Sequence, residues 1–140
     1  MRQIITTKPK RIAVDTNIFV YLRDNNTEKK MQAIEVIKLM PVVSAQVVSE
    51  YLNVIKRLFK LPKQQILEIC MNDLKGCHIQ QITYYTLFLA KKLIEIYDFQ
   101  LFDSIVVASA LEAGCSTLYS EDMHSGLVVE KQLEIINPFL

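Results

Sequence analysis

The sequence predicts an α/β fold built around a parallel sheet. Short β-branched runs alternate along the chain with longer segments whose apolar residues recur at helical spacing, which is typical of βαβ units. The 140 residues are 51% hydrophobic, which suits one compact domain with a substantial core. Because the chain has no internal repeat and no Gly/Ser-rich linker, we expect a single domain.

Four short apolar runs are the predicted strands: RIAV, PVVS, STLYS and LEIIN, at residues 11–14, 41–44, 116–120 and 133–137. The intervening segments with helical periodicity are the predicted helices, at about residues 17–23, 27–39, 45–60, 63–75, 84–97 and 103–113. Gly76 and Gly114 follow the fourth and the last of these helices, where C-terminal caps belong.

Charge and composition narrow the classes of protein. The formal net charge of +1 means that any binding to a polyanion must depend on local basic clusters. The sequence has no apolar stretch of about 18 residues or more and no signal-peptide core, so we expect a cytoplasmic protein with no membrane segment. Cys70, Cys77 and Cys115 lack C-x-x-C spacing and are interpreted as small buried hydrophobic residues.

The first candidate functional residue is Asp15, which ends the first predicted strand in the run AVDTN. In open parallel sheets the functional crevice lies outside the carboxyl ends of the strands, so an acid at this point is well placed for chemistry. A second interpretation remains open, because Asp15 or Asn17 could simply cap the helix that follows.

Glu50 lies on the predicted helix at residues 45–60. Val48, Leu52, Ile55 and Phe59 have the spacing of a core-facing stripe, and Glu50 lies on a different face together with Asn53 and Arg57. A glutamate on a solvated helix face is ordinary, so spacing alone does not make Glu50 catalytic.

Two more acids occupy comparable places later in the chain. Asp103 opens a helix that is apolar almost all round, and Asp122 follows the strand STLYS, with Ser120 and Glu121 beside it. Helix capping for Asp103 and a loop turn for Asp122 are the structural alternatives.

Three of these four acids stand where a parallel sheet brings chain segments to one crevice, and Glu50 lies early on a helix that leaves a strand end. Gathered carboxylates repel one another, and a divalent cation relieves the repulsion. Carboxylate oxygens suit Mg2+ or Mn2+. Zinc is disfavoured, because His78 and His124 have no paired spacing with each other or with the cysteines.

The runs AVDTNIFVY, SAQVVSEYLNVI, YDFQLFDSIVVASALEAGC and LYSEDMHSG, followed by the terminal IINPF, resemble the PIN domain family, in particular the bacterial toxins of the VapC type. The resemblance covers residues 11–139 and leaves residues 1–10 as an N-terminal extension. It implies a three-layer α/β/α sandwich with a central parallel sheet. It also implies an Mg2+/Mn2+-dependent endoribonuclease, whose catalytic acids match Asp15, Glu50, Asp103 and Asp122.

The resemblance further implies a role for each site residue. Asp15 and Asp103 are expected to be the principal metal ligands, and Asp122 a ligand directly or through water. Glu50 is expected to ligate through water or to orient and deprotonate the attacking water. Asn17 and Ser120 are expected to hold the acids in place by hydrogen bonds. Whether Glu121 or Asp122 faces the metal depends on the local strand register.

The resemblance also implies products with a 5'-phosphate and a 3'-hydroxyl, since water rather than the ribose hydroxyl is the nucleophile. The RNA substrate is negatively charged, so a cationic rim is expected around the acids. The candidates for RNA binding are Arg57 and Lys56, with Lys60, Lys63 and Arg23 nearby. All of them could equally be solvated surface charges.

Other classes of protein compete with the nuclease. Haloacid-dehalogenase phosphatases require a second aspartate where Asn17 stands, and a receiver-type domain requires an acid pair at the first strand and a matched late lysine. A PIN-like binding module that acts through a protein partner without turnover is the remaining alternative.

By resemblance, the toxin of a type II toxin–antitoxin pair is expected to form a homodimer. It is also expected to be held inactive by an antitoxin that places a basic side chain in the acidic pocket. Predicted helices 27–39 and 45–60 have enough apolar residues for such contacts, although core packing explains these residues equally well. The sequence leaves open which RNA is cleaved, the number of metal ions and whether an antitoxin exists.

Overall fold

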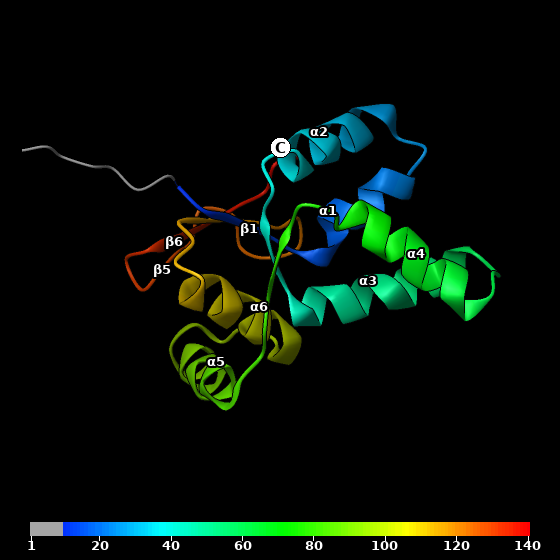
Figure 1. Ribbon diagram of the computed structural model, residues 1–140. Helices are drawn as coiled ribbons and strands as arrows, with labels where there is room; N and C mark the ends of the chain where they lie inside the picture. The colour runs from blue at the N-terminus through cyan, green and yellow to red at the C-terminus, as the bar shows by residue number, and fades with distance from the viewer. Residues whose placement is uncertain (1–9) are drawn as a thin grey trace, which may run out of the picture.

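The computed structural model describes residues 10–140, in which helices cover both faces of a six-stranded sheet (Figure 1). The strands are β1 (Ile12–Val14), β2 (Val42–Ser44), β3 (His78–Gln80), β4 (Thr117–Tyr119), β5 (Val128–Val129) and β6 (Leu133–Ile136). Their order is β3-β2-β1-β4-β6-β5, and every pairing is parallel except that of β5 with β6. The predicted α/β sandwich with a central parallel sheet is confirmed, with the correction that β5 is antiparallel.

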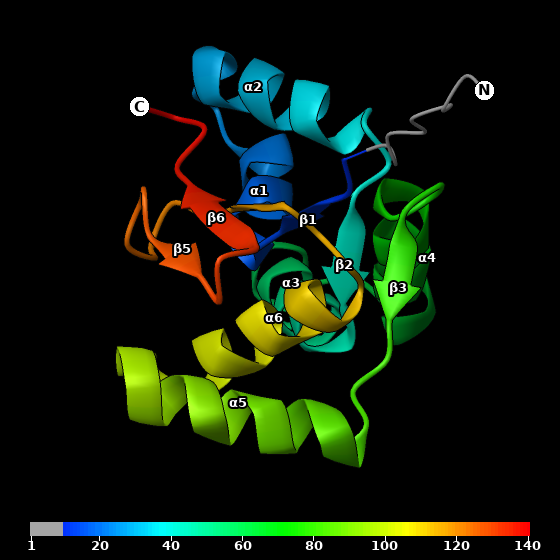
Figure 2. The ribbon, with the colours of Figure 1, turned by 90° about the vertical axis from the view of Figure 1, so that its left-hand side faces the viewer.

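The helices are α1 (Thr16–Val20), continued by the 3-10 turn η1 (Tyr21–Arg23), then α2 (Thr27–Ile37), α3 (Ala45–Leu58), α4 (Lys63–Asp73), α5 (Tyr84–Tyr97) and α6 (Leu101–Glu112). Helices α3 and α4 lie on one face of the sheet, and α6 lies on the other with α5 outside it (Figures 1 and 2). No helix of residues 10–140 is both long and apolar enough to cross a membrane.

The sequence prediction missed β3 and β5. Strand β3 is an edge strand whose first two residues are exposed, so it lacks the apolar run that marks a buried strand. Strand β5 has only two residues. The last helix begins at Leu101, two positions before the predicted start, so Asp103 lies in its first turn rather than at the cap.

Helix α3 shows which of two possible apolar stripes faces the core. Its fully buried residues are Val47, Tyr51 and Ile55, whereas Val48 and Leu52 of the predicted stripe are only half-buried. The prediction is therefore confirmed for Ile55 and wrong for Val48 and Leu52, because the large side chain of Tyr51 occupies the centre of the buried stripe.

Gly114 ends α6 with a backbone conformation that favours glycine, φ +75°. The amide of Gly114 donates to the Leu111 carbonyl and the amide of Cys115 to the Ala110 carbonyl, both at 3.0 Å, which is a Schellman cap. The predicted cap at Gly114 is confirmed, whereas Gly76 lies two residues after Leu74, the C-cap of α4. Cys115 and Cys70 are buried and Cys77 is half-buried, and all three thiols are free.

The register of the sheet brings distant residues to one edge. Val14 of β1 lies opposite Tyr119 of β4 and opposite Val43 of β2. The residues that follow β1 and β4, Asp15 and Ser120, therefore leave the carboxyl edge of the sheet side by side.

Candidate active site

Asp15 is fixed at the carboxyl end of β1. One carboxylate oxygen, Oδ1, accepts a hydrogen bond of 2.8 Å from the Thr16 amide, and the other, Oδ2, accepts one of 2.9 Å from the Ser120 hydroxyl. Asp15 is the N-cap of α1 and is only 6% exposed. The capping interpretation and the functional one are thus compatible, because the cap holds a buried carboxylate at the crevice.

Ser120 connects Asp15 to the loop that follows β4. Its side chain is fully buried, and its hydroxyl oxygen also accepts a hydrogen bond of 3.3 Å from the Met123 amide. The expected hydrogen bond from Ser120 to the acids is present, and its acceptor is Asp15.

Glu50 projects from the second turn of α3 toward α1. Its Oε1 accepts a hydrogen bond of 3.1 Å from the Gln46 amide group, and its Oε2 accepts one from the Thr16 hydroxyl. Thr16 was missed as a site residue by sequence reasoning. The position of Thr16 in the sequence could have identified it, since a hydroxyl next to an acid at a strand end is well placed to hold a second acid.

Asp103 and Asp122 line one cavity of about 370 Å³. Asp103 lies in the first turn of α6 and is half-buried, whereas Asp122 is exposed in the loop after β4. The Asn17 amide group donates a hydrogen bond of 3.3 Å to Asp122 Oδ2, so Asn17 contacts this acid rather than Asp15. The cavity is completed by the residues Tyr97, Asp98, Phe99, Gln100, Met123, His124 and Leu127.

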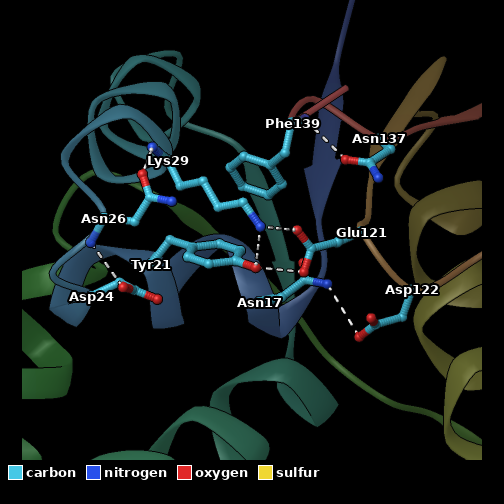
Figure 3. A network of polar contacts seen from close by, with 9 residues as sticks. All are labelled: Asn17, Tyr21, Asp24, Asn26, Lys29, Glu121, Asp122, Asn137 and Phe139. Carbon is cyan, nitrogen blue, oxygen red and sulfur yellow. Dashed lines mark hydrogen bonds and ion pairs between the residues drawn. The ribbon is translucent and has the colours of Figure 1, made fainter.

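Glu121 is held by Tyr21 and Lys29. Its carboxylate accepts a hydrogen bond of 2.5 Å from the Tyr21 hydroxyl and forms an ion pair of 3.1 Å with Lys29 (Figure 3). Asp122, the next residue of the same loop, contacts Asn17 and lines the cavity (Figure 3). Tyr21 and Lys29 thus contact Glu121, whereas Asp122 contacts Asn17 and lines the cavity together with Asp103. Below, Asp15, Glu50, Asp103 and Asp122 are called the acid site.

The carboxylate charges of the acid site raise the pKa values of Asp15 and Asp103. Burial raises the pKa of the Asp15 carboxyl from 3.8 to about 6, and the charges of Asp103 and Glu50 add to the rise, against the opposing hydrogen bonds from Thr16 and Ser120.

The pKa of Asp103 is shifted in the same direction as that of Asp15. Burial raises the pKa of its carboxyl, and the charges of Glu50 and Asp122 raise it further. Each of the four acids therefore interacts with at least one of the others, as the sequence analysis expected of acids that share one crevice.

The donor set fits a hard divalent cation in its chemistry. All four side chains offer carboxylate oxygens, and Asn17 Oδ1 is buried without a hydrogen-bond partner, while Nδ2 of the same amide group donates to Asp122. The spacing is looser than expected, because no three His, Cys, Asp or Glu side chains in the described part of the chain are grouped closely enough to hold a metal ion. Three ligands on one ion would therefore require side-chain movement.

The proposed basic rim is only partly near these acids. Arg57 lies two turns beyond Glu50 on the same face of α3, and it is exposed. Lys56 and Lys63 line a separate cavity of about 280 Å³ between α3 and α4, whose lining contains none of the four acids. Arg23 is engaged in a 2.6 Å ion pair with Asp73.

Comparison with known proteins adds a family and a fold. The family model of the PIN domain matches residues 12–124. A toxin–antitoxin complex from Klebsiella pneumoniae contains a chain that is 17% identical, with a TM-score of 0.70 over 92% of this chain and 98% of that chain. No curated protein matches the chain.

Two further solved structures share the fold. VapC20 from Mycobacterium tuberculosis, described as a sarcin–ricin loop cleaving toxin, is 17% identical, with a TM-score of 0.63 over 79% of this chain and 89% of that chain. VapBC2 from Rickettsia felis, bound to a DNA fragment from its promoter, is 17% identical, with a TM-score of 0.61 over 90% of this chain and 98% of that chain.

Proposed function

The chain belongs to the PIN domain family, and from that premise we propose that it is a metal-dependent endoribonuclease that hydrolyses RNA phosphodiester bonds. One observation carries the proposal. Within residues 10–140, no lysine, arginine or histidine forms an ion pair with any residue of the acid site, although Asp15 is almost completely buried. Buried ionised carboxylates without a cationic partner are unfavourable, and either a proton or a bound cation relieves the cost.

Asp15, Asp103 and Asp122 are the residues that would hold Mg2+ or Mn2+. The bound ion supplies Lewis-acid activation of water and charge stabilisation at the phosphate. Asp15 is the most rigid of the three, because two hydrogen bonds fix both of its oxygens. Asp122 is oriented by a single contact with Asn17, so it is the acid with the greatest freedom to adjust.

Glu50 acts as the proton acceptor in this proposal. The Thr16 hydroxyl and the Gln46 amide group hold its two oxygens separately, which orients the carboxylate without neutralising its charge. A carboxylate held in this way can orient an attacking water and accept its proton. The expected products carry a 5'-phosphate and a 3'-hydroxyl.

The 370 Å³ cavity provides the approach for RNA. Asp103 and Asp122 lie in its wall beside Phe99, whose ring is half-buried and could stack against a base. Arg57 is the better placed of the two candidate RNA-binding cations, because it shares the Glu50 face of α3, and Lys56 is the weaker candidate.

We further propose that the chain is the toxin of a type II pair and acts in the cytoplasm. Its fold resembles a chain of a toxin–antitoxin complex and VapBC2. A basic side chain of an antitoxin would find uncompensated carboxylates in the acid site, and this charge complementarity supports the expected mode of inhibition.

A homodimer is proposed through α5 and the start of α6. Tyr84, Phe88, Leu101 and Phe102 are between 54% and 85% exposed on these helices, which is unusual for large apolar side chains. A second copy is the favoured occupant, because an apolar surface of this kind can face itself across a twofold axis. Leu101 and Phe102 directly precede Asp103, so the partner would lie at the rim of the acid site.

The alternative is a PIN-like binding module without turnover. One observation favours it, namely the absence of three metal-spaced ligands within residues 10–140. The uncompensated charge of Asp15 favours the nuclease.

An RNA cleavage assay separates the two functions. The purified chain is incubated with single-stranded and structured RNAs in Mn2+ or Mg2+, and we expect cleavage that EDTA and Asp15→Asn abolish. Asp24→Asn, which removes a carboxylate from an exposed position outside the acid site, should leave the rate unchanged. Cleavage that persists in EDTA contradicts the metal mechanism, and Mn2+ binding without cleavage of any RNA supports the binding module.

A further inference from the structure

Glu121 belongs to a cluster of side chains from four separate segments (Figure 3). Lys29 Nζ of α2 lies 3.1 Å from Glu121 Oε2 and 3.0 Å from the Tyr21 hydroxyl, and that hydroxyl donates to Glu121 Oε1 at 2.5 Å. The Lys29 ammonium also lies over the rings of Tyr21 and Phe139, 4.7 and 5.7 Å from their centroids. We call Tyr21, Lys29, Glu121 and Phe139 the Lys29 cluster.

Phe139 connects the cluster to the C-terminal segment. Its ring packs edge-on against Tyr21, with 4.6 Å between centroids, and its amide donates to the Asn137 side chain at 2.9 Å. The Asn137 amide in turn donates to the Ser125 hydroxyl at 3.1 Å. The loop that carries Glu121 and Asp122 is therefore tied at both of its ends, since the Ser120 amide also donates to the Ile136 carbonyl at 3.0 Å.

The two adjacent acids of this loop, Glu121 and Asp122, are contacted by two residues that lie one helical turn apart. Asn17 and Tyr21 are four residues apart in the segment formed by α1 and η1, and a spacing of four places them on the same side of a helix. Asn17 contacts Asp122, and Tyr21 contacts Glu121. The two neighbouring carboxylates are thereby held in different directions, one beside the cavity and the other in the Lys29 cluster.

We propose that Lys29 and Tyr21 are positioning residues for the metal site, because they hold Glu121 away from the acid site and so direct Asp122 toward it. This inference rests on the proposed function. Lys29 also neutralises Glu121, so the loop presents one uncompensated carboxylate to the acid site instead of two adjacent ones. Groups that orient metal ligands from outside typically change metal affinity about 10- to 100-fold when they are removed.

The test measures Mn2+ affinity by calorimetric titration and by electron paramagnetic resonance. Lys29→Met keeps most of the apolar stem over the two rings and removes the charge, and Tyr21→Phe removes only the hydroxyl. The matched control is Lys30→Met, at the adjacent exposed position of α2. We expect Lys29→Met and Tyr21→Phe to weaken Mn2+ binding by about tenfold, and Lys30→Met to have no effect.

The same substitutions are repeated in an Asp122→Asn background to separate positioning from general stability. If Lys29 acts through Asp122, then Lys29→Met has no further effect on Mn2+ affinity once Asp122 is neutral. An equal loss in both backgrounds overturns the inference, and so does equal Mn2+ affinity of Lys29→Met and Lys30→Met. An unsubstituted chain that binds no Mn2+ overturns the proposed function itself and this inference with it.

Discussion

Replacing Asp15 with asparagine should stabilise the metal-free protein at neutral pH, although it abolishes the proposed activity. Asp15 is 6% exposed, and its burial raises the pKa of the carboxyl from 3.8 to about 6. Because this pKa is higher in the folded protein than in the unfolded chain, the folded state binds the proton more tightly. Ionisation of Asp15 therefore opposes folding.

The pH range of the effect follows from these two values. The stability contributed by protonated Asp15 is fully present below about pH 4 and is lost as the pH rises through about 6. The difference between the two pKa values corresponds to about 3 kcal/mol of unfolding free energy. In a protein of this size such a difference changes the melting temperature by roughly 6–12 °C.

The assay is urea and thermal unfolding in EDTA between pH 4 and pH 8, for the unsubstituted protein, Asp15→Asn and the exposed control Asp24→Asn. Relative to Asp15→Asn, the unsubstituted protein should lose stability between pH 4 and pH 6 and remain less stable above that range. Any change in the hydrogen bonds from Thr16 and Ser120 adds an amount that does not depend on pH. A stability difference that stays constant from pH 4 to pH 8 would therefore refute the reasoning.

Three further substitutions test the neighbours of the acids and the apolar surface. Thr16→Val removes the hydroxyl that orients Glu50, and at saturating RNA it should lower kcat by about tenfold with little change in melting temperature; an unchanged kcat contradicts the role of Glu50. Ser120→Ala removes a hydrogen bond to ionised Asp15, so the pKa of Asp15 should rise and Mn2+ affinity should fall most strongly at low pH. If the variant and the unsubstituted protein have the same pH profile of Mn2+ binding, this role of Ser120 is contradicted. Phe88→Asp places a charge on the exposed α5 surface and should yield monomers in sedimentation velocity at a concentration where the unsubstituted protein is dimeric; an unchanged dimer would locate the interface elsewhere.

Elements with strong local signals were predictable from the sequence. Helix α5 has the predicted bounds, because Thr83 forms a capping box with Thr86 at its start and Asp98 adopts a left-handed conformation at its end. Strand β3 carries no comparable signal, since an exposed edge strand needs no apolar alternation. Its position is set by pairing with β2, which is a tertiary contact.

The sequence likewise predicted some residues of the candidate site and left others open. Strand ends identified Asp15 and Asp122 as candidates, because the geometry of parallel sheets is general. In the proposed site, the choice between Glu121 and Asp122 depends on Tyr21 and Lys29, about a hundred residues earlier in the chain. Neither pattern nor spacing within the loop contains that information.

Each residue of the run Asp15, Thr16 and Asn17 serves a different part of the acid site. Asp15 is the buried carboxylate, the Thr16 hydroxyl donates to Glu50, and the Asn17 amide group donates to Asp122. One turn after a strand therefore organises three of the four acids. An apolar strand that ends in acid, hydroxyl and amide side chains is explained by this geometry, and helix capping alone would require only the first of them.

The partners of these carboxylates also separate two kinds of acid. Neutral groups such as the Ser120 hydroxyl hold Asp15, whereas a cation, Lys29, holds Glu121. A neutral donor orients a carboxylate and leaves its charge uncompensated, while an ammonium group both orients and neutralises it. A lysine beside Asp15 would compete with a divalent ion for the same oxygens. The distribution of neutral and cationic partners is therefore the one expected of the proposed metal site, with Glu121 outside it.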